Sequence, residues 1–132
     1  MSGELMLVCQ KCKREVHQGC LWVSFDEIRT LPVLHKHWEE TCAASAVTLE
    51  ALGAAPDEIT WKVHHDGCTP ALEDAYSVEV RQVATWAGLS RWTAHLMAKN
   101  WFACSDWDEV LREAAGESTE APRIVARVAG AA

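Results

Sequence analysis

Two short motifs decide the fold of this chain: Val8-Cys9-Gln10-Lys11-Cys12 near the N-terminus and Val63-His64-His65-Asp66-Gly67-Cys68 at the middle. The first contains a C-x2-C pair and the second an H-x2-C pair. Thiolate and imidazole groups are the ligands of closed, tetrahedral structural zinc sites. We therefore expect one zinc ion to be held by Cys9, Cys12, His65 and Cys68.

The segments beside the two motifs read as strands. Leu5-Met6-Leu7-Val8 and Gly19-Cys20-Leu21-Trp22-Val23 flank the first pair, which predicts a hairpin whose turn carries both thiols. Ile59, Trp61 and Val63 alternate with polar residues, as in a half-buried strand that ends at the second pair. This alternation favours residue 65 over residue 64 as the imidazole ligand, because only residue 65 shares the side of Val63.

Other ligand sets stay open at this level. His64 could replace His65, and His17 with Cys20 would complete a local cluster close to a zinc knuckle. Cys42, near His35 and His37, could also compete, although Cys42 and Cys104 fit equally well as small buried residues. A catalytic zinc requires an open position and a nearby base, and the chain has no H-E-x-x-H motif and no H-x-E…P-C-x-x-C motif. We therefore expect a structural site.

Composition limits the compartment and the partners. The chain has 132 residues, enough for one domain, and a net charge of −7, which disfavours non-specific nucleic-acid binding. No signal peptide or membrane-spanning apolar run is recognised, so the six cysteines are expected in a reducing cytosol, as metal ligands rather than disulfides. Residues 80–105 contain Arg81, Arg91 and Lys99 but no acid, so a local basic face is expected within an acidic chain.

Helical segments are predicted between and after the motifs. A capping-box pattern at Ser24-Phe25-Asp26-Glu27 predicts a short helix that ends before Pro32, and an apolar stripe predicts a second helix over about 33–52. Further on, alternation over 76–80 predicts a strand, and helical periodicity is expected over about 85–100.

The C-terminal part is predicted to contain one more helix. It would begin after Ser105-Asp106 and stop at Gly116, and 117–132 would form a loosely held, flexible tail, with a strand in 123–128 as the alternative. The resulting fold class is a small zinc-stabilised α+β domain over residues 1–116. It would have short antiparallel strands and three to four helices, whose tryptophans pack against them: Trp38, Trp92, Trp101 and Trp107.

Residues 82–99 carry a second feature, which can be read as a helix-turn-helix. Gly88 would allow the turn and Ser90 would lie at the start of a second helix, whose face would carry Arg91, His95 and Lys99. The alternative is a single amphipathic helix with an interior glycine and a solvated basic face.

Three pieces of the chain resemble a family of small, uncharacterised actinobacterial and actinobacteriophage proteins. The pieces are Cys9-x2-Cys12 with Gly19-x-Leu21-Trp22-Val23, then Trp61-x-Val63-x-His65-x2-Cys68, then Trp92-Thr93-Ala94-His95-Leu96-Met97-x-Lys99-x-Trp101 with Ser105-Asp106-Trp107. The resemblance covers about residues 5–111. It implies a zinc fold, a phage-type origin, His65 as the ligand and a continuous helix through the third piece. It implies no activity.

The expected function is that of a non-catalytic structural-zinc protein, a phage accessory or regulatory factor in the host bacterial cytosol. Its partner is expected to be a macromolecule, a protein rather than nucleic acid, bound around Arg91, His95 and Lys99. One alternative is a DNA-binding regulator that uses residues 82–99. Another is a small metal-dependent enzyme with His95 or His17 as the base.

Overall fold

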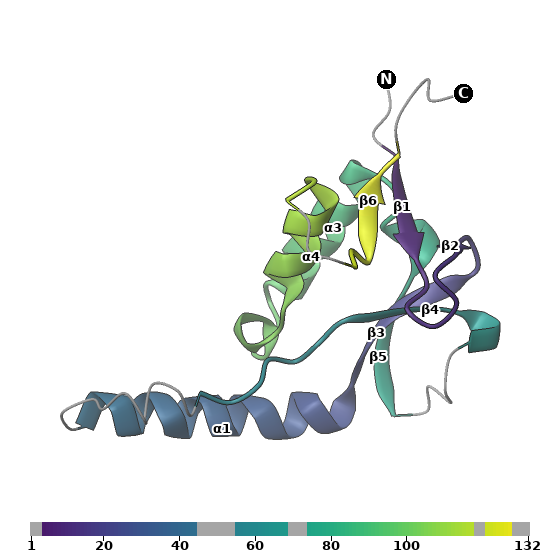
Figure 1. The fold of residues 1–132 in the computed structure, drawn as a ribbon. Helices are drawn as coiled ribbons and strands as arrows, with labels where there is room; N and C mark the ends of the chain where they lie inside the picture. Colours follow the sequence, from purple (N-terminus) through teal and green to yellow (C-terminus); the bar gives the residue numbers. More distant parts are fainter. Residues whose placement is uncertain (1–3, 45–54, 69–73, 118–120, 128–132) are drawn as a thin grey trace.

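Two small antiparallel sheets form the centre of the protein (Figure 1). The computed structural model describes residues 4–44, 55–68, 74–117 and 121–127. In the first sheet, β1 (Leu5–Val8) pairs on one side with β2 (Glu15–Val16) and on the other with β6 (Ile124–Ala126). A hairpin whose turn carries the C-x2-C motif is therefore present, but its second strand is Glu15–Val16 and not the predicted segment 19–23, which belongs to the other sheet.

Strand β6 corrects the prediction of a flexible tail for residues 121–127, a described part of the predicted tail 117–132. Ile124 is fully buried opposite Leu7, and the neighbouring Arg123 is also buried. The alternative, a strand within 123–128, is the arrangement found, over Ile124–Ala126. The C-terminal segment 121–127 therefore contributes to the hydrophobic core together with β1.

The second sheet places β3 (Gly19–Ser24) between β4 (Lys62–His65) and β5 (Ala75–Glu79), again antiparallel. Ile59, Trp61 and Val63 are fully buried, as their alternation predicted. Val80 also faces the core, but it begins the 3-10 turn η2 (Val80–Gln82) and does not extend the strand.

Helix α1 (Phe25–Ala44) is a single helix of 20 residues, so the predicted break at Pro32 is wrong. The Ser24 hydroxyl accepts a hydrogen bond from the Asp26 amide at its start, as the capping pattern indicated. Figure 1 shows α1 extending past both sheets, and Val33 and Leu34 remain 67% and 50% exposed. On such an exposed helix, water can satisfy the carbonyl that proline leaves unpaired. The predicted continuation to residue 52 lies mostly outside the described residues.

Tryptophans fill the space between the second sheet and the C-terminal helices. Trp61 and Trp107 are fully buried with ring centroids 4.9 Å apart, and Trp101 lies 6.0 Å from Trp61. The remaining two of the expected set, Trp38 and Trp92, are only half-buried. Trp107 begins α4 (Trp107–Ala114), which follows the 3-10 turn η3 (Phe102–Cys104). Within the described ranges, no helix combines the length and apolar character needed to cross a membrane.

Helix α3 (Trp86–Leu96) is continuous, as the alternative of a single amphipathic helix predicted, so the helix-turn-helix interpretation with its turn at Gly88 is wrong. Thr85 caps the helix by accepting a hydrogen bond from the Gly88 amide at 3.0 Å. Gly88 lies in the first turn of the helix for a packing reason: an added Cβ would come within 2.2 Å of the Gln82 carbonyl oxygen. Glycine therefore lets η2 approach the helix closely and forms no turn between two helices.

Gly88→Ala is expected to lower the free energy of unfolding by about 1–3 kcal/mol, because overpacking against backbone outweighs the gain in helix propensity. Chemical denaturation of the variant and the original protein measures this loss. Gly67→Ala is the matched control, since an added Cβ at Gly67 meets nothing within 4 Å. An unchanged Gly88→Ala midpoint would contradict the close packing of η2 on α3.

Candidate metal centre

Four side chains from separate parts of the chain converge on one point. Cys9 and Cys12 lie in the turn between β1 and β2, and His65 ends β4. Cys68 follows in the 3-10 turn η1 (Asp66–Cys68). One ligand atom from each of the four lies within 4.8 Å of the others, an arrangement that could hold a metal ion. The set is the one that the two sequence motifs predicted.

The backbone of the β1–β2 turn orients the first two thiols. The Cys9 amide donates to the Arg14 carbonyl, and the Lys13 amide donates to the Cys9 carbonyl, both at 2.9 Å. Lys13 adopts a positive φ of 65°, which reverses the chain tightly after the second thiol. The Cys12 amide then points at the Cys9 sulfur, 3.5 Å away. This turn aims both sulfur atoms to the same side and supplies an N–H donor to one of them.

His65 is oriented by a hydrogen bond from its far nitrogen. Its Nε2 lies 2.8 Å from the Glu15 carbonyl oxygen, while Nδ1 lies 3.3 Å from the Cys12 sulfur. A carbonyl can only accept, so Nε2 carries the proton and Nδ1 keeps its lone pair for a metal. His64 points elsewhere: the Trp22 indole N–H donates to its Nδ1 at 2.9 Å. The prediction of residue 65 over residue 64 is therefore confirmed for the cluster.

The electrostatics of the cluster favour a cation. Burial raises the pKa of the Cys9 thiol, but backbone amide donors, including those of Cys12 and His65, outweigh it and lower that pKa to about 5. The Arg14 amide likewise lowers the pKa of Cys12. Burial and the adjacent Cys9 sulfur raise the pKa of Cys68. Crowded thiolates repel one another, and a divalent ion at their centre would remove that repulsion.

The competing ligands lie outside the cluster. His17 is 77% exposed and lies 3.4 Å from a Glu15 carboxylate oxygen. Cys20 is buried on β3, where burial and the nearby Asp66 raise its pKa. The alternative of a local zinc knuckle, in which His17 and Cys20 join the first two thiols, is therefore not the cluster that the structure shows. His35 contacts the Asp57 carbonyl, and the other cysteines are half-buried on α1 and η3: Cys42 and Cys104.

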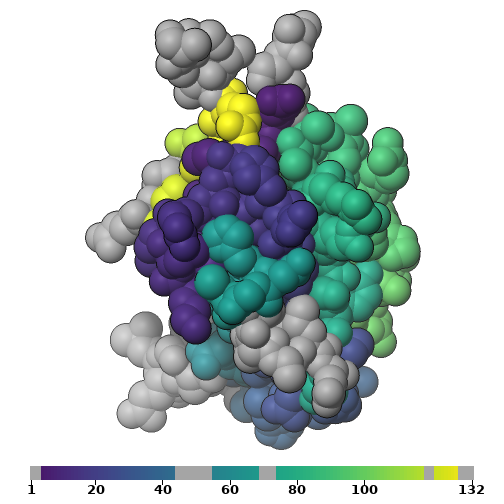
Figure 2. All heavy atoms as spheres, turned by 90° about the vertical axis from the view of Figure 1, so that its right-hand side faces the viewer, coloured from purple at the N-terminus to yellow at the C-terminus, as the bar shows by residue number. Residues whose placement is uncertain are grey.

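The ligand cluster lies where the two sheets meet. Gln10, between the two thiols of the first motif, donates its amide to the Val63 carbonyl, and its side-chain oxygen accepts from the Val63 amide. Two hydrogen bonds of Gln10 thus connect the two motifs, and the ligand side chains of both motifs converge on one point. Figure 2 shows the middle segment around β4 and η1 packed directly against the N-terminal hairpin on one face of the molecule. A bound ion would fix the two sheets relative to each other at this contact.

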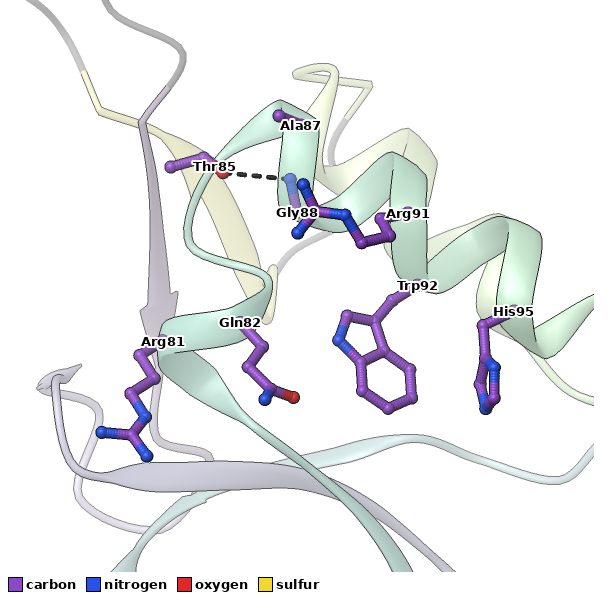
Figure 3. Close-up of a pocket in the computed structure, with 8 residues that line it drawn as sticks. All are labelled: Arg81, Gln82, Thr85, Ala87, Gly88, Arg91, Trp92 and His95. Atoms are coloured by element: carbon purple, nitrogen blue, oxygen red, sulfur yellow. Dashed lines mark hydrogen bonds between the residues drawn. The ribbon is translucent and has the colours of Figure 1, made fainter.

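The predicted partner-binding residues are only partly brought together. Arg91 and His95 line a groove of about 500 Å³ between η2 and α3, shown in Figure 3. Lys99 is not among its lining residues, because α3 ends at Leu96 and the Lys99 ammonium lies 5.6 Å above the Tyr76 ring. The prediction of one continuous Arg91–His95–Lys99 face is therefore wrong for Lys99. Arg81 also lines the groove, and the residue spacing of helix α3 could not have indicated it, because Arg81 belongs to η2.

A buried ion-pair network was missed by sequence reasoning. Arg123 donates to Asp106 at 2.7 Å and to Glu113 at 2.6 Å, and all three side chains are almost completely buried. Arg123 also donates to the Trp61 carbonyl at 2.9 Å. These partners are distant in sequence, so no local pattern links them. The network belongs to the packing of β6 and α4 and adds nothing to the metal centre.

Comparison with known protein families, with curated proteins and with solved structures finds no match to this chain.

Proposed function

We propose that this protein is a non-catalytic binding protein whose fold is held by one structural zinc ion. The observation that carries the proposal is the convergence of four protein ligands within 4.8 Å of one another. Three sulfurs and one imidazole nitrogen suit zinc, whereas Mg²⁺ and Ca²⁺ prefer oxygen ligands. Four protein ligands complete a tetrahedral shell and leave no position for water or substrate, which supports a structural role. The proposed ligands are Cys9, Cys12, His65 and Cys68.

The partner is proposed to be a protein that binds at the groove of Arg91 and His95. The net charge of −7 and the single continuous helix α3 favour a protein over DNA. Neither suggested base supports the alternative of a metal-dependent enzyme, because His17 is mostly exposed beside Glu15 and His95 lines the groove and not the metal cluster. The resemblance to actinobacteriophage proteins supports an accessory or regulatory factor that acts in a bacterial cytosol.

Metal analysis tests the zinc proposal. Protein purified under reducing conditions is expected to contain one zinc ion per chain, as measured by inductively coupled plasma mass spectrometry. The Cys9→Ser, Cys68→Ser double variant is expected to contain almost none, because two of the four ligands are lost. Cys42→Ser is the matched control, and it should keep its zinc, since Cys42 lies outside the cluster. Unchanged zinc in the double variant, or iron in place of zinc, would refute the assignment.

A further inference from the structure

We propose that the groove between η2 and α3 binds an acidic segment of a partner protein. Arg81 and Arg91 would hold carboxylates of this segment, and Trp92 would contact an apolar side chain next to them. The inference rests on the proposed function, for which it names the chemistry of the partner.

The groove brings together groups from two elements. Arg81 and Gln82 extend from η2, and Arg91, Trp92 and His95 extend from α3. In the view of Figure 3, the side chains of Arg81, Gln82, Trp92 and His95 follow one another across the groove, and Arg91 lies beside the first turn of the helix. Its volume of about 500 Å³ is within the range of binding clefts.

The two guanidinium groups are available to a ligand. Arg91 is exposed, and no carboxylate of the described residues lies within ion-pair distance of it. Arg81 pairs with Glu79, but both side chains are mostly exposed, at 78% and 56%. An exposed pair of this kind contributes little free energy, so a ligand carboxylate can replace Glu79. Because 80–105 contains no acid, nothing within that segment opposes the approach of an anion.

The rest of the lining offers apolar surface next to these charges. Trp92 is half-buried and its ring meets His95 edge to face, with centroids 4.9 Å apart. Ala87 and Gly88 complete the lining on the side of the helix and add no charge to it. Tryptophan and arginine are the residues that most often dominate the free energy of protein–protein binding. Guanidinium groups also match carboxylates through two parallel hydrogen bonds.

Charge favours a short acidic peptide over a nucleic-acid strand. A single strand carries a phosphate on every nucleotide and is held by a positively charged track with several stacking rings. This groove offers two arginines and one half-buried tryptophan on a chain of net charge −7. A peptide with two or three carboxylates places its charge within the groove and avoids the acidic remainder of the surface.

Fluorescence anisotropy with defined probes tests the inference. The probes are dye-labelled ten-residue peptides with four glutamates around a central Trp, Phe, Leu or Ala, matched peptides with glutamine in place of glutamate, and labelled dT10. The zinc-loaded full chain is expected to bind acidic peptides with an apolar centre at least tenfold more tightly than their glutamine counterparts. Binding should weaken between 50 and 300 mM NaCl, because exposed charges are screened by salt.

Two substitutions with equal charge change locate the binding. Arg91→Gln is expected to lower the affinity for the acidic peptides by about tenfold, which is the effect of losing one charge-assisted hydrogen-bonding group. Arg29→Gln, on α1 and far from the groove in sequence, should leave the affinity unchanged, since Arg29 pairs with Asp26 and Asp74. Equal binding of acidic and glutamine peptides, equal effects of the two variants, or tighter Arg91-dependent binding of dT10 would each overturn the inference.

A cross-linking arm separates this inference from the proposed function. A photoreactive amino acid replaces Gln82, an exposed residue that lines the groove, or Arg29 on α1, and the protein is irradiated in actinobacterial cells. A protein adduct formed at position 82 and absent at position 29 supports a partner at the groove. If this adduct forms while acidic peptides fail to bind, the groove has a partner of other chemistry and only this inference is wrong. If no adduct forms, the proposed partner surface is itself wrong.

Discussion

Treatment with a strong zinc chelator is expected to remove most of the stability of this protein. Apparent binding free energies of structural zinc are about 10–16 kcal/mol in zinc-finger peptides, which is comparable to the whole stability of an ordinary domain, about 5–15 kcal/mol. The ion would also neutralise the charge of sulfur atoms that lie close together. One of them belongs to Cys9, whose pKa is lowered to about 5, so that its thiol is ionised at neutral pH. Thermal unfolding followed by near-ultraviolet circular dichroism, which reports the packed tryptophans, measures the loss.

Cys12→Ser is the genetic counterpart of this treatment. It is expected to melt near the temperature of the chelated original protein and to show no further change when chelator is added. Cys42→Ser should behave like the original protein in both conditions, since Cys42 lies outside the cluster. If chelation leaves the melting temperature of the original protein unchanged, zinc does not stabilise this fold.

Arg123→Met is expected to lower the free energy of unfolding by about 3–5 kcal/mol, the usual effect of removing one partner from a buried ion pair. The Arg123 guanidinium is 7% exposed, and its loss leaves the carboxylates of Asp106 and Glu113 buried without a cation. Burial lowers the pKa of Arg123, but these two carboxylates outweigh it and raise that pKa, which keeps the guanidinium charged. Denaturant titration monitored by circular dichroism gives the free energy.

The matched control is Arg112→Met on α4, where Arg112 pairs with Asp108 and Glu109 in an exposed position. That variant should lose less than about 1 kcal/mol, as exposed pairs do. The double variant Arg123→Met, Glu113→Leu should recover part of the loss, because it removes one of the stranded charges. Equal losses in Arg123→Met and Arg112→Met would contradict a stabilising role for the buried network.

The ligands of the metal cluster could be predicted from sequence because they form two pairs, and the two members of each pair are close together in the sequence. Spacing in C-x2-C and H-x2-C places each pair at one turn, and the period of two in a strand distinguishes residue 65 from residue 64. The same period identified Ile59 and Trp61 as buried. What the sequence could not supply was proof that the two pairs meet, which depends on β4 lying beside the N-terminal turn through Gln10.

Pro32 was expected to end a helix, but an exposed helix tolerates it because water can satisfy the free carbonyl. Two other failed predictions share a different physical cause, which is that a distant contact overrides a local preference. Gly88 was read as a turn, yet it serves the close approach of Gln82. Residues 121–127 were expected to belong to a loosely held tail, but there Arg123 pairs with Glu113 on α4. Such pairings leave no pattern in the residues beside them.

The pairing of β1 with β6 has a consequence for the order of events during synthesis. Strand β1 is synthesised well before its partner Ile124–Ala126, which follows more than a hundred residues later. At usual elongation rates of about 5–20 residues per second, one edge of β1 waits on the order of 10 s. Meanwhile its apolar face and unpaired backbone are open to other chains. A nascent-chain chaperone that shields residues 5–8 would therefore protect this strand edge during the interval before β6 is made.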